Sequence, residues 1–143
     1  MAVITVSTVV EAPAERVWEL VGDFHALGDW HPHLPASRLG NELAGNAIGS
    51  ARLFDLDGVV LHETLLAYDD EARSYTYSFP DGTFHFDNYR ATLRVTPVTE
   101  LGASFVEWSV TYDIDAEHRE ESTARVHGVF TVGLAALRER FAA

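Results

Sequence analysis

The sequence predicts an α+β protein: a curved antiparallel sheet of about seven strands wraps around a long C-terminal helix, with two short helices after the first strand. Short β-rich runs separated by turn residues fill most of the chain up to residue 113. The later runs alternate between apolar and polar residues, which is typical of an antiparallel sheet with one buried face. The tail, from about Glu117 to Phe141, has no proline and repeats apolar residues at helical spacing. A sheet curled around a helix encloses a space lined by both, so we expect an internal cavity.

The N-terminal segment contains the first strand and both short helices. Residues 3–10 form a β-branched run, which is the composition of a strand. Pro13 is placed to open a helix that reaches about Gly22, because proline is well tolerated at the start of a helix. Asp23 can cap a second, shorter helix that ends near Gly28, ahead of two prolines.

Six further strands are expected between the short helices and the tail. They lie at about residues 36–43, 48–56, 59–68, 73–80, 86–96 and 103–113. Turn-forming Gly, Pro, Asn and Asp residues separate them. In the last two strands, the residues expected to face the buried side are Tyr89, Ala91, Leu93, Val95, Val106, Trp108, Val110 and Tyr112. The tail helix should pack on this face through Val126, Val129, Phe130, Gly133, Leu134, Leu137 and Phe141.

Composition limits the possible chemistry. The 143 residues are expected to form one domain, 1–143, and the net charge of −12 opposes binding to nucleic acid or to anionic membranes. There is no cysteine and all ten basic residues are arginine, which excludes thiol nucleophiles, disulfides and lysine Schiff bases. No apolar run approaches the roughly 20 residues that span a bilayer, and the N-terminus lacks signal-peptide features. We therefore expect a cytoplasmic protein without stable membrane association; monomer and homodimer both stay open.

The strongest local signal is the Asp57-Gly58 pair between two β-rich runs. Both central residues of a type I′ turn need positive φ, so this pair predicts a tight hairpin. The turn then sets the register and places Arg52 opposite Glu63, on a face that is otherwise apolar and includes Phe54.

The Arg52–Glu63 pair has two interpretations. It can be a structural ion pair that fixes the strand register, although buried pairs often add little net stability. It can also be the polar end of a ligand cavity, where Arg52 holds a ligand oxyanion and Glu63 orients it or acts as a base. Burial would raise the pKa of Glu63, whereas the arginine would lower it.

Aromatic residues with polar tips are numerous on the expected inner faces. Tyr75, Tyr77, Tyr89, Trp108 and Tyr112 can be ordinary core, or they can bind a planar, oxygenated ligand. Tyr77 and Tyr89 are the candidate proton donors. The turn before Tyr75 could shift the register by one residue and reverse the face that Tyr75 and Tyr77 occupy.

Two loops are expected to flank the cavity mouth. Trp30 and His31 follow the second helix and can either contact ligand or simply end that helix. His85 lies in the opposite turn and shares the parity of Tyr89, so we expect it to face inward. His31 and His33 could supply metal ligands together with another His or Glu, but no established metal spacing is present, and we assign no metal and no cofactor.

Short motifs in this order resemble a known superfamily over nearly the whole chain, from about Val3 to Phe141. The segments that carry the resemblance are Ala12-Pro13-Ala-Glu-Arg-Val17-Trp18, Gly28-Asp-Trp30-His31-Pro32, Gly49-Ser-Ala-Arg52, His62-Glu63-Thr-Leu, Tyr75-Thr-Tyr77, Asn88-Tyr89-Arg-Ala-Thr and Val106-Glu107-Trp108. They resemble the helix-grip (SRPBCC, START and Bet v 1-like) superfamily, and most closely its bacterial polyketide cyclase/dehydrase-like branch. Polyketide cyclases use a cavity arginine to polarise a substrate oxygen, so the resemblance implies this role for Arg52.

Two functions follow from these expectations. The first is binding of a small hydrophobic, aromatic or polyketide-like ligand, with cofactor-free cyclisation, dehydration or isomerisation by acid–base chemistry. Its catalytic candidates are Arg52, Glu63, Tyr77 and His85. Its candidate ligand contacts are Trp30, His31, Phe54, Tyr75, Tyr89, Trp108, Tyr112 and Phe130. The second is a non-catalytic carrier or sensor of hydrophobic small molecules.

Overall fold

The computed structural model describes residues 1–142 and has the predicted architecture of one antiparallel sheet and one long helix. The strands are β1 (Ala2–Val10), β2 (Arg38–Leu39), β3 (Ala51–Leu56), β4 (Val59–Asp69), β5 (Ser74–Ser78), β6 (Asp87–Val98) and β7 (Ala103–Asp113). The α-helices are α1 (Ala14–Val21), α2 (Leu27–Trp30) and α3 (Arg119–Arg140), and the 3₁₀ turns are η1 (Phe24–Ala26) and η2 (Thr83–His85). None of the helices within residues 1–142 is long and apolar enough to cross a membrane.

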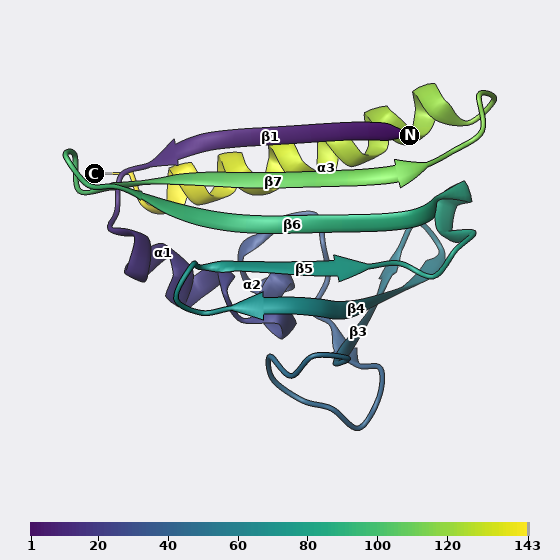
Figure 1. The fold of residues 1–143 in the computed structure, drawn as a ribbon, viewed down its shortest axis with the longest axis horizontal. Helices are drawn as coiled ribbons and strands as arrows, with labels where there is room; N and C mark the ends of the chain where they lie inside the picture. The colour runs from purple at the N-terminus through teal and green to yellow at the C-terminus, as the bar shows by residue number, and fades with distance from the viewer. Residues whose placement is uncertain (143) are drawn as a thin grey trace.

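The sheet has the order β1-β7-β6-β5-β4-β3-β2, and all neighbouring strands are antiparallel. In Figure 1, α3 lies behind β1 and β7, and α2 lies behind β5. The helices therefore cover one face of the sheet, and the predicted inner residues of β6 and β7 are all buried there.

The hairpin predicted at Asp57-Gly58 is confirmed in its register. Both residues have positive φ, and Arg52 pairs with Glu63. Two adjacent residues that tolerate the left-handed conformation are enough to determine which side chains share a face along both strands.

A β-bulge in β4 settles the orientation of Tyr75 and Tyr77. The pairing of β4 with β5 shifts between Leu65 and Ala67, so Leu65 pairs with Tyr77 and Tyr68 pairs with Tyr75. The extra residue on β4 shifts the alternation of inward and outward side chains along that strand by one position. Tyr75 and Tyr77 can therefore both point inward, although one pairs with an odd-numbered residue of β4 and the other with an even-numbered one. Both are almost fully buried.

The prediction of a strand at residues 36–43 is correct only for Arg38 and Leu39 and wrong for the rest of that range. Only Arg38–Leu39 pairs with β3, and β3 itself begins at Ala51 rather than at residue 48. Gly45 and Gly49 adopt positive φ in the intervening loop, which extends below β3 in Figure 1. Such turns interrupt the pairing of an edge strand.

The tail helix packs through the predicted stripe, and Gly133 is its point of closest approach. A Cβ at Gly133 would lie 2.7 Å from His31 Cδ2 and 3.0 Å from Trp108 Cζ3. The glycine therefore lets α3 approach α2 and β7, and the space beneath it is filled by these two rings.

Candidate ligand-binding cavity

Arg52 and Glu63 form a buried ion pair between β3 and β4. Arg52 is fully buried, Glu63 is 3% exposed, and Arg52 Nε donates a hydrogen bond to Glu63 Oε1 at 2.6 Å. The predicted juxtaposition is thus present, and it lies on the inner face of the sheet.

Phe24 of η1 holds the other side of the guanidinium. Arg52 Nη1 donates to the carbonyl oxygen of Phe24, and the Phe24 ring centre lies 4.1 Å from Arg52 Cζ. The Tyr77 ring centre lies at 4.9 Å. A carbonyl, a carboxylate and two π faces together compensate for the removal of this charge from water. Phe24 could not be predicted as a partner of Arg52, because this contact depends on how the helical segment docks on the sheet.

Tyr75 also lies beside the guanidinium, with its ring centre 5.9 Å from Arg52 Cζ. Neither its hydroxyl nor Arg52 Nη2 has a hydrogen-bond partner of acceptable geometry. Burial raises the pKa of Tyr75, and the nearby guanidinium opposes this rise. Both residues are buried, and neither lines the neighbouring cavity.

The cavity lies between the sheet and α3. Its volume is about 40 Å³. Its lining is almost entirely apolar or aromatic and consists of Leu27, Leu34, Phe54, Leu56, Leu61, Glu63, Tyr77, Phe79, Phe84, Phe86, Tyr89, Trp108, Arg125, Val126, Val129 and Phe130. Six of the predicted site residues thus line the same cavity: Phe54, Glu63, Tyr77, Tyr89, Trp108 and Phe130.

Glu63 is the only carboxylate in this lining. Burial raises the pKa of Glu63 above its ordinary value, and the charge and hydrogen bond of Arg52 reduce the rise. A rise in the pKa of a carboxylate makes it a stronger base, and general bases in enzymes are often tuned in this direction by burial. Arg52 meanwhile stays protonated, because its pKa is raised beside Glu63 in spite of burial.

Two tyrosines add hydroxyl groups to the wall. Trp108 Nε1 donates to the Tyr77 hydroxyl oxygen at 3.1 Å, and a hydrogen bond links the Tyr77 and Tyr89 side chains. Burial raises the pKa values of Tyr77 and Tyr89 well above the ordinary value, with Glu63 adding to both shifts. Both hydroxyls are therefore neutral hydrogen-bond donors at physiological pH.

Four predicted ligand contacts are buried but do not line the cavity: Trp30, His31, Tyr75 and Tyr112. Trp30 packs on Trp108 with ring centres 5.6 Å apart, and the Tyr112 hydroxyl lies 3.3 Å from Thr123 Oγ1. These rings form the layer of core that supports the wall.

His31 connects the segment that follows α2 to α3 through hydrogen bonds of its side chain. Its Nε2 donates to the carbonyl oxygen of Val129 at 2.7 Å, and the backbone N–H of His33 donates to its Nδ1 at 3.2 Å. A carbonyl can only accept and an N–H can only donate, so this arrangement requires the neutral imidazole with its hydrogen on Nε2. The shared metal site considered for His31 and His33 is not assembled, because both ring nitrogens of His31 are engaged by backbone groups.

Acid is expected to weaken the fold through His31. Burial lowers the pKa of His31, so below the ordinary histidine pKa of about 6.5 the unfolded chain takes up a proton that the folded protein resists. Stability is therefore lost as the pH falls through this window. Urea unfolding of the wild type and His31→Gln at pH 8 and pH 5 measures it: the advantage of the wild type should shrink at pH 5. An advantage of equal size at both pH values would contradict the assignment.

The prediction that His85 faces inward is wrong. His85 is exposed and stacks on His118, with ring centres 3.6 Å apart. Phe84, His85 and Asn88 all have positive φ, and the pairing of β6 with β7 is irregular between Asp87 and Arg90. Strand alternation therefore does not extend back to His85, and Phe86 occupies the inner face instead.

Arg125 of α3 stands at the mouth of the cavity, and the sequence analysis missed it. Its Nη1 lies 2.7 Å from Asp57 Oδ2 at the tip of the β3–β4 hairpin, and its Cζ lies 4.2 Å from the Phe84 ring centre. The available signal was weak: Arg125 is polar, but it directly precedes Val126 and lies one helical turn before Val129 in the apolar stripe.

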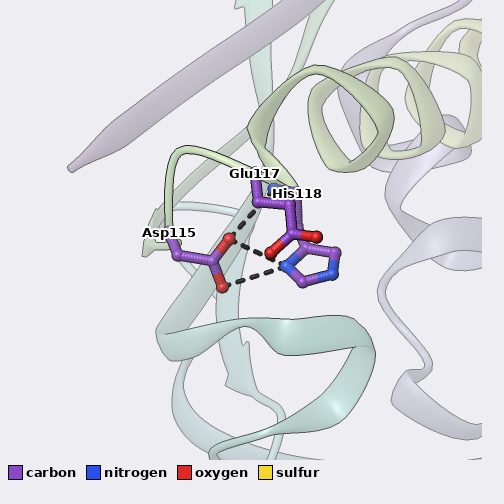
Figure 2. A group of neighbouring side chains, drawn as sticks. All are labelled: Asp115, Glu117 and His118. Atoms are coloured by element: carbon purple, nitrogen blue, oxygen red, sulfur yellow. Dashed lines mark hydrogen bonds and ion pairs between the residues drawn. The ribbon is translucent and has the colours of Figure 1, made fainter.

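Asp115, Glu117 and His118 gather at the start of α3 (Figure 2), with one potential ligand atom from each within 4.8 Å of the others. Asp115 accepts hydrogen bonds from the backbone N–H of His118 at 3.0 Å and from its Nδ1 at 2.8 Å. Asp115 and His118 are therefore held together by the hydrogen bonds of the turn that precedes α3.

Known proteins resemble this chain in sequence and in fold. A family model described as "Polyketide cyclase / dehydrase and lipid transport" matches residues 1–142. Among curated proteins, no sequence matches the chain.

Solved structures show the same fold. A protein from Thermobifida fusca is 38% identical, with a TM-score of 0.87 over 99% of this chain and 93% of that one. An uncharacterised protein from Bacillus thuringiensis is 36% identical, with a TM-score of 0.85 over 99% and 100% of the two chains. The Zhui aromatase/cyclase of a Streptomyces species is 17% identical, with a TM-score of 0.77 over 97% and 92%. The shared architecture is the helix-grip fold that the motifs indicated.

Proposed function

Because the chain belongs to the polyketide cyclase/dehydrase and lipid transport family, we propose that it binds an aromatic or polyketide-like molecule between the sheet and α3 and moves protons on it. The observation that carries this proposal is Glu63, the single carboxylate in a lining that is otherwise apolar or aromatic except for Arg125, with its pKa raised by burial. Apolar walls with a few polar groups are typical of small-molecule sites.

The proposed chemistry is proton abstraction next to a ligand carbonyl. Glu63 takes a proton from carbon, and the resulting enolate oxygen accepts a hydrogen bond from Tyr77 or Tyr89. Return of the proton from Glu63 to a different carbon of the conjugated enolate completes an isomerisation. Attack of the enolate carbon on a second carbonyl of the same ligand forms the new C–C bond, and the proton held by Glu63 passes to the resulting alkoxide to complete an aldol cyclisation. Arg52 does not line the cavity, so we assign it a positioning role through Glu63.

Ligand binding requires the cavity to widen. A volume of about 40 Å³ accommodates a few water molecules, whereas small-molecule sites usually measure about 300–1,000 Å³. Five of the lining side chains are only half-buried and could move to admit a ligand: Leu56, Phe79, Phe84, Arg125 and Val129.

The test uses 2-tetralone, an apolar bicyclic ketone with exchangeable α-protons. In D₂O the wild type should accelerate deuterium uptake at these carbons, measured by NMR, and Glu63→Gln should lose about 10²–10⁴ of that acceleration. Glu107→Gln, on the outer face of β7, is the matched control and should keep it. Because Glu63→Gln leaves Arg52 without its carboxylate, circular dichroism must show a folded variant, and Tyr77→Phe provides a second, milder test. Equal acceleration by wild type and Glu63→Gln contradicts the catalytic assignment.

A non-catalytic carrier is the second candidate. It is favoured by the ion pair between Arg52 Nε and Glu63 Oε1, which gives Glu63 a partner when no ligand is bound. Binding of 2-tetralone without any acceleration of exchange would select this function.

A further inference from the structure

A second, polar hollow adjoins the mouth of the cavity. Its volume is about 130 Å³, and it shares two wall residues, Phe84 and Arg125, with the apolar cavity. The rest of its lining is polar and consists of His85, His118, Glu121 and Ser122. A molecule that fills the cavity can therefore extend into the hollow only past Phe84 and Arg125.

Ser122 is the unexplained group in this hollow. The residue is 5% exposed, and its hydroxyl is buried without a hydrogen-bond partner. A buried hydroxyl that lacks a partner costs free energy, so an acceptor that reaches it gains more than one that meets a solvated serine. Ser122 precedes Arg125 by three residues on α3, which places both on the same side of the helix.

Arg125 is held by a partner that is easily replaced. The side chain of Asp57 is 65% exposed where it pairs with Arg125, and exposed ion pairs contribute little net stability. A ligand anion that arrives on the apolar side of Arg125 can take the place of this carboxylate.

The two ends of the combined space prefer opposite groups. Glu63 at the inner end disfavours an anion, and Arg125 is the only arginine that lines either space within residues 1–142. The net charge of −12 disfavours multiply charged ligands such as phosphate esters, so the anion that best fits is a single carboxylate.

We propose that the ligand is an aromatic carboxylic acid whose apolar body fills the cavity and whose carboxylate lies in the hollow, bound by Arg125 and the Ser122 hydroxyl. This inference rests on the proposed function for the apolar part of the ligand only. It makes Arg125 the residue that selects acids over their neutral analogues, and it makes Asp57 and Glu121 competitors for the same position.

The test compares 2-naphthoate with 2-naphthamide, which have the same rings and differ in charge. Affinities are measured by isothermal titration calorimetry for the wild type and for Arg125→Gln, Asp57→Asn and Ser122→Ala. Arg38→Gln is the matched control, because Arg38 also pairs with an exposed hairpin aspartate, Asp55, but lines neither space.

The wild type should bind the acid about tenfold more tightly than the amide, as a charge-assisted hydrogen bond allows. Arg125→Gln should abolish this preference by weakening binding of the acid far more than binding of the amide, and Ser122→Ala should reduce the preference. Asp57→Asn should strengthen binding of the acid, because it removes the competing carboxylate. Arg38→Gln should leave the preference intact.

Opposite effects of Arg125→Gln and Asp57→Asn on acid binding support anion recognition. If both variants shift the acid and the amide alike, the Arg125–Asp57 pair acts only as a latch on the mouth, and the inference is overturned. Equal wild-type affinity for acid and amide also overturns it but leaves the proposed cavity function standing. If neither compound binds, the proposed function itself fails.

Discussion

Arg52→Met is expected to lower the free energy of unfolding by about 3–5 kcal/mol, the usual cost of removing one partner from a buried ion pair. Glu63 would then remain in an apolar wall without its hydrogen-bond donor. The carbonyl of Phe24 would also lose its donor, Arg52 Nη1. Urea unfolding at pH 7 measures the loss.

The double variant Arg52→Met/Glu63→Leu is the control for this prediction. Removal of both charges eliminates the unpaired carboxylate, so the double variant should regain most of the lost stability. Greater instability of the double variant than of Arg52→Met would show that the ion pair itself, rather than the isolated charge, determines the stability.

Phe130→Ala is expected to cost about 3–5 kcal/mol of unfolding free energy, because it truncates a fully buried ring. Phe130 stacks on Trp108 with ring centres 4.3 Å apart, and both line the cavity. The same substitution should enlarge the space between β7 and α3, so the variant should gain affinity for 2-tetralone even as the apo protein becomes less stable.

Thermal unfolding with and without the ketone tests this prediction. The increase in midpoint temperature caused by the ketone should be larger for Phe130→Ala than for the wild type. Phe105→Ala, on the outer face of β7, is the matched aromatic truncation and should not increase the effect of the ketone. A smaller effect of the ketone in Phe130→Ala would mean that the surrounding core collapses into the vacated space.

The hairpin and the inner face of the sheet could be predicted because their determinants are local. Asp57-Gly58 sets the register of β3 and β4 by itself, and alternation along β6 and β7 needs no knowledge of distant residues. The same local logic failed at His85, where three residues with positive φ separate the turn from the regular strand.

The arrangement around Arg52 could be predicted only in part. The sequence placed Glu63 opposite Arg52, but the depth of the guanidinium behind the cavity wall depends on Phe24, which approaches from η1. Arg125 was missed for a related reason: its place at the mouth depends on the hairpin tip and the β5–β6 turn, which come together only in the folded sheet.

The sheet order also has a consequence for folding. β1 pairs with β7 along its whole length, so Ala2 meets Tyr112 and the first strand stays without its neighbour until nearly all of the chain has left the ribosome. Closing a loop of this length costs entropy before any contact repays it, which is typical of slow folding. Until β1 and α3 arrive, the inner face that contains Trp108 is open to solvent, so the apolar residues that later line the cavity are then exposed to misassociation.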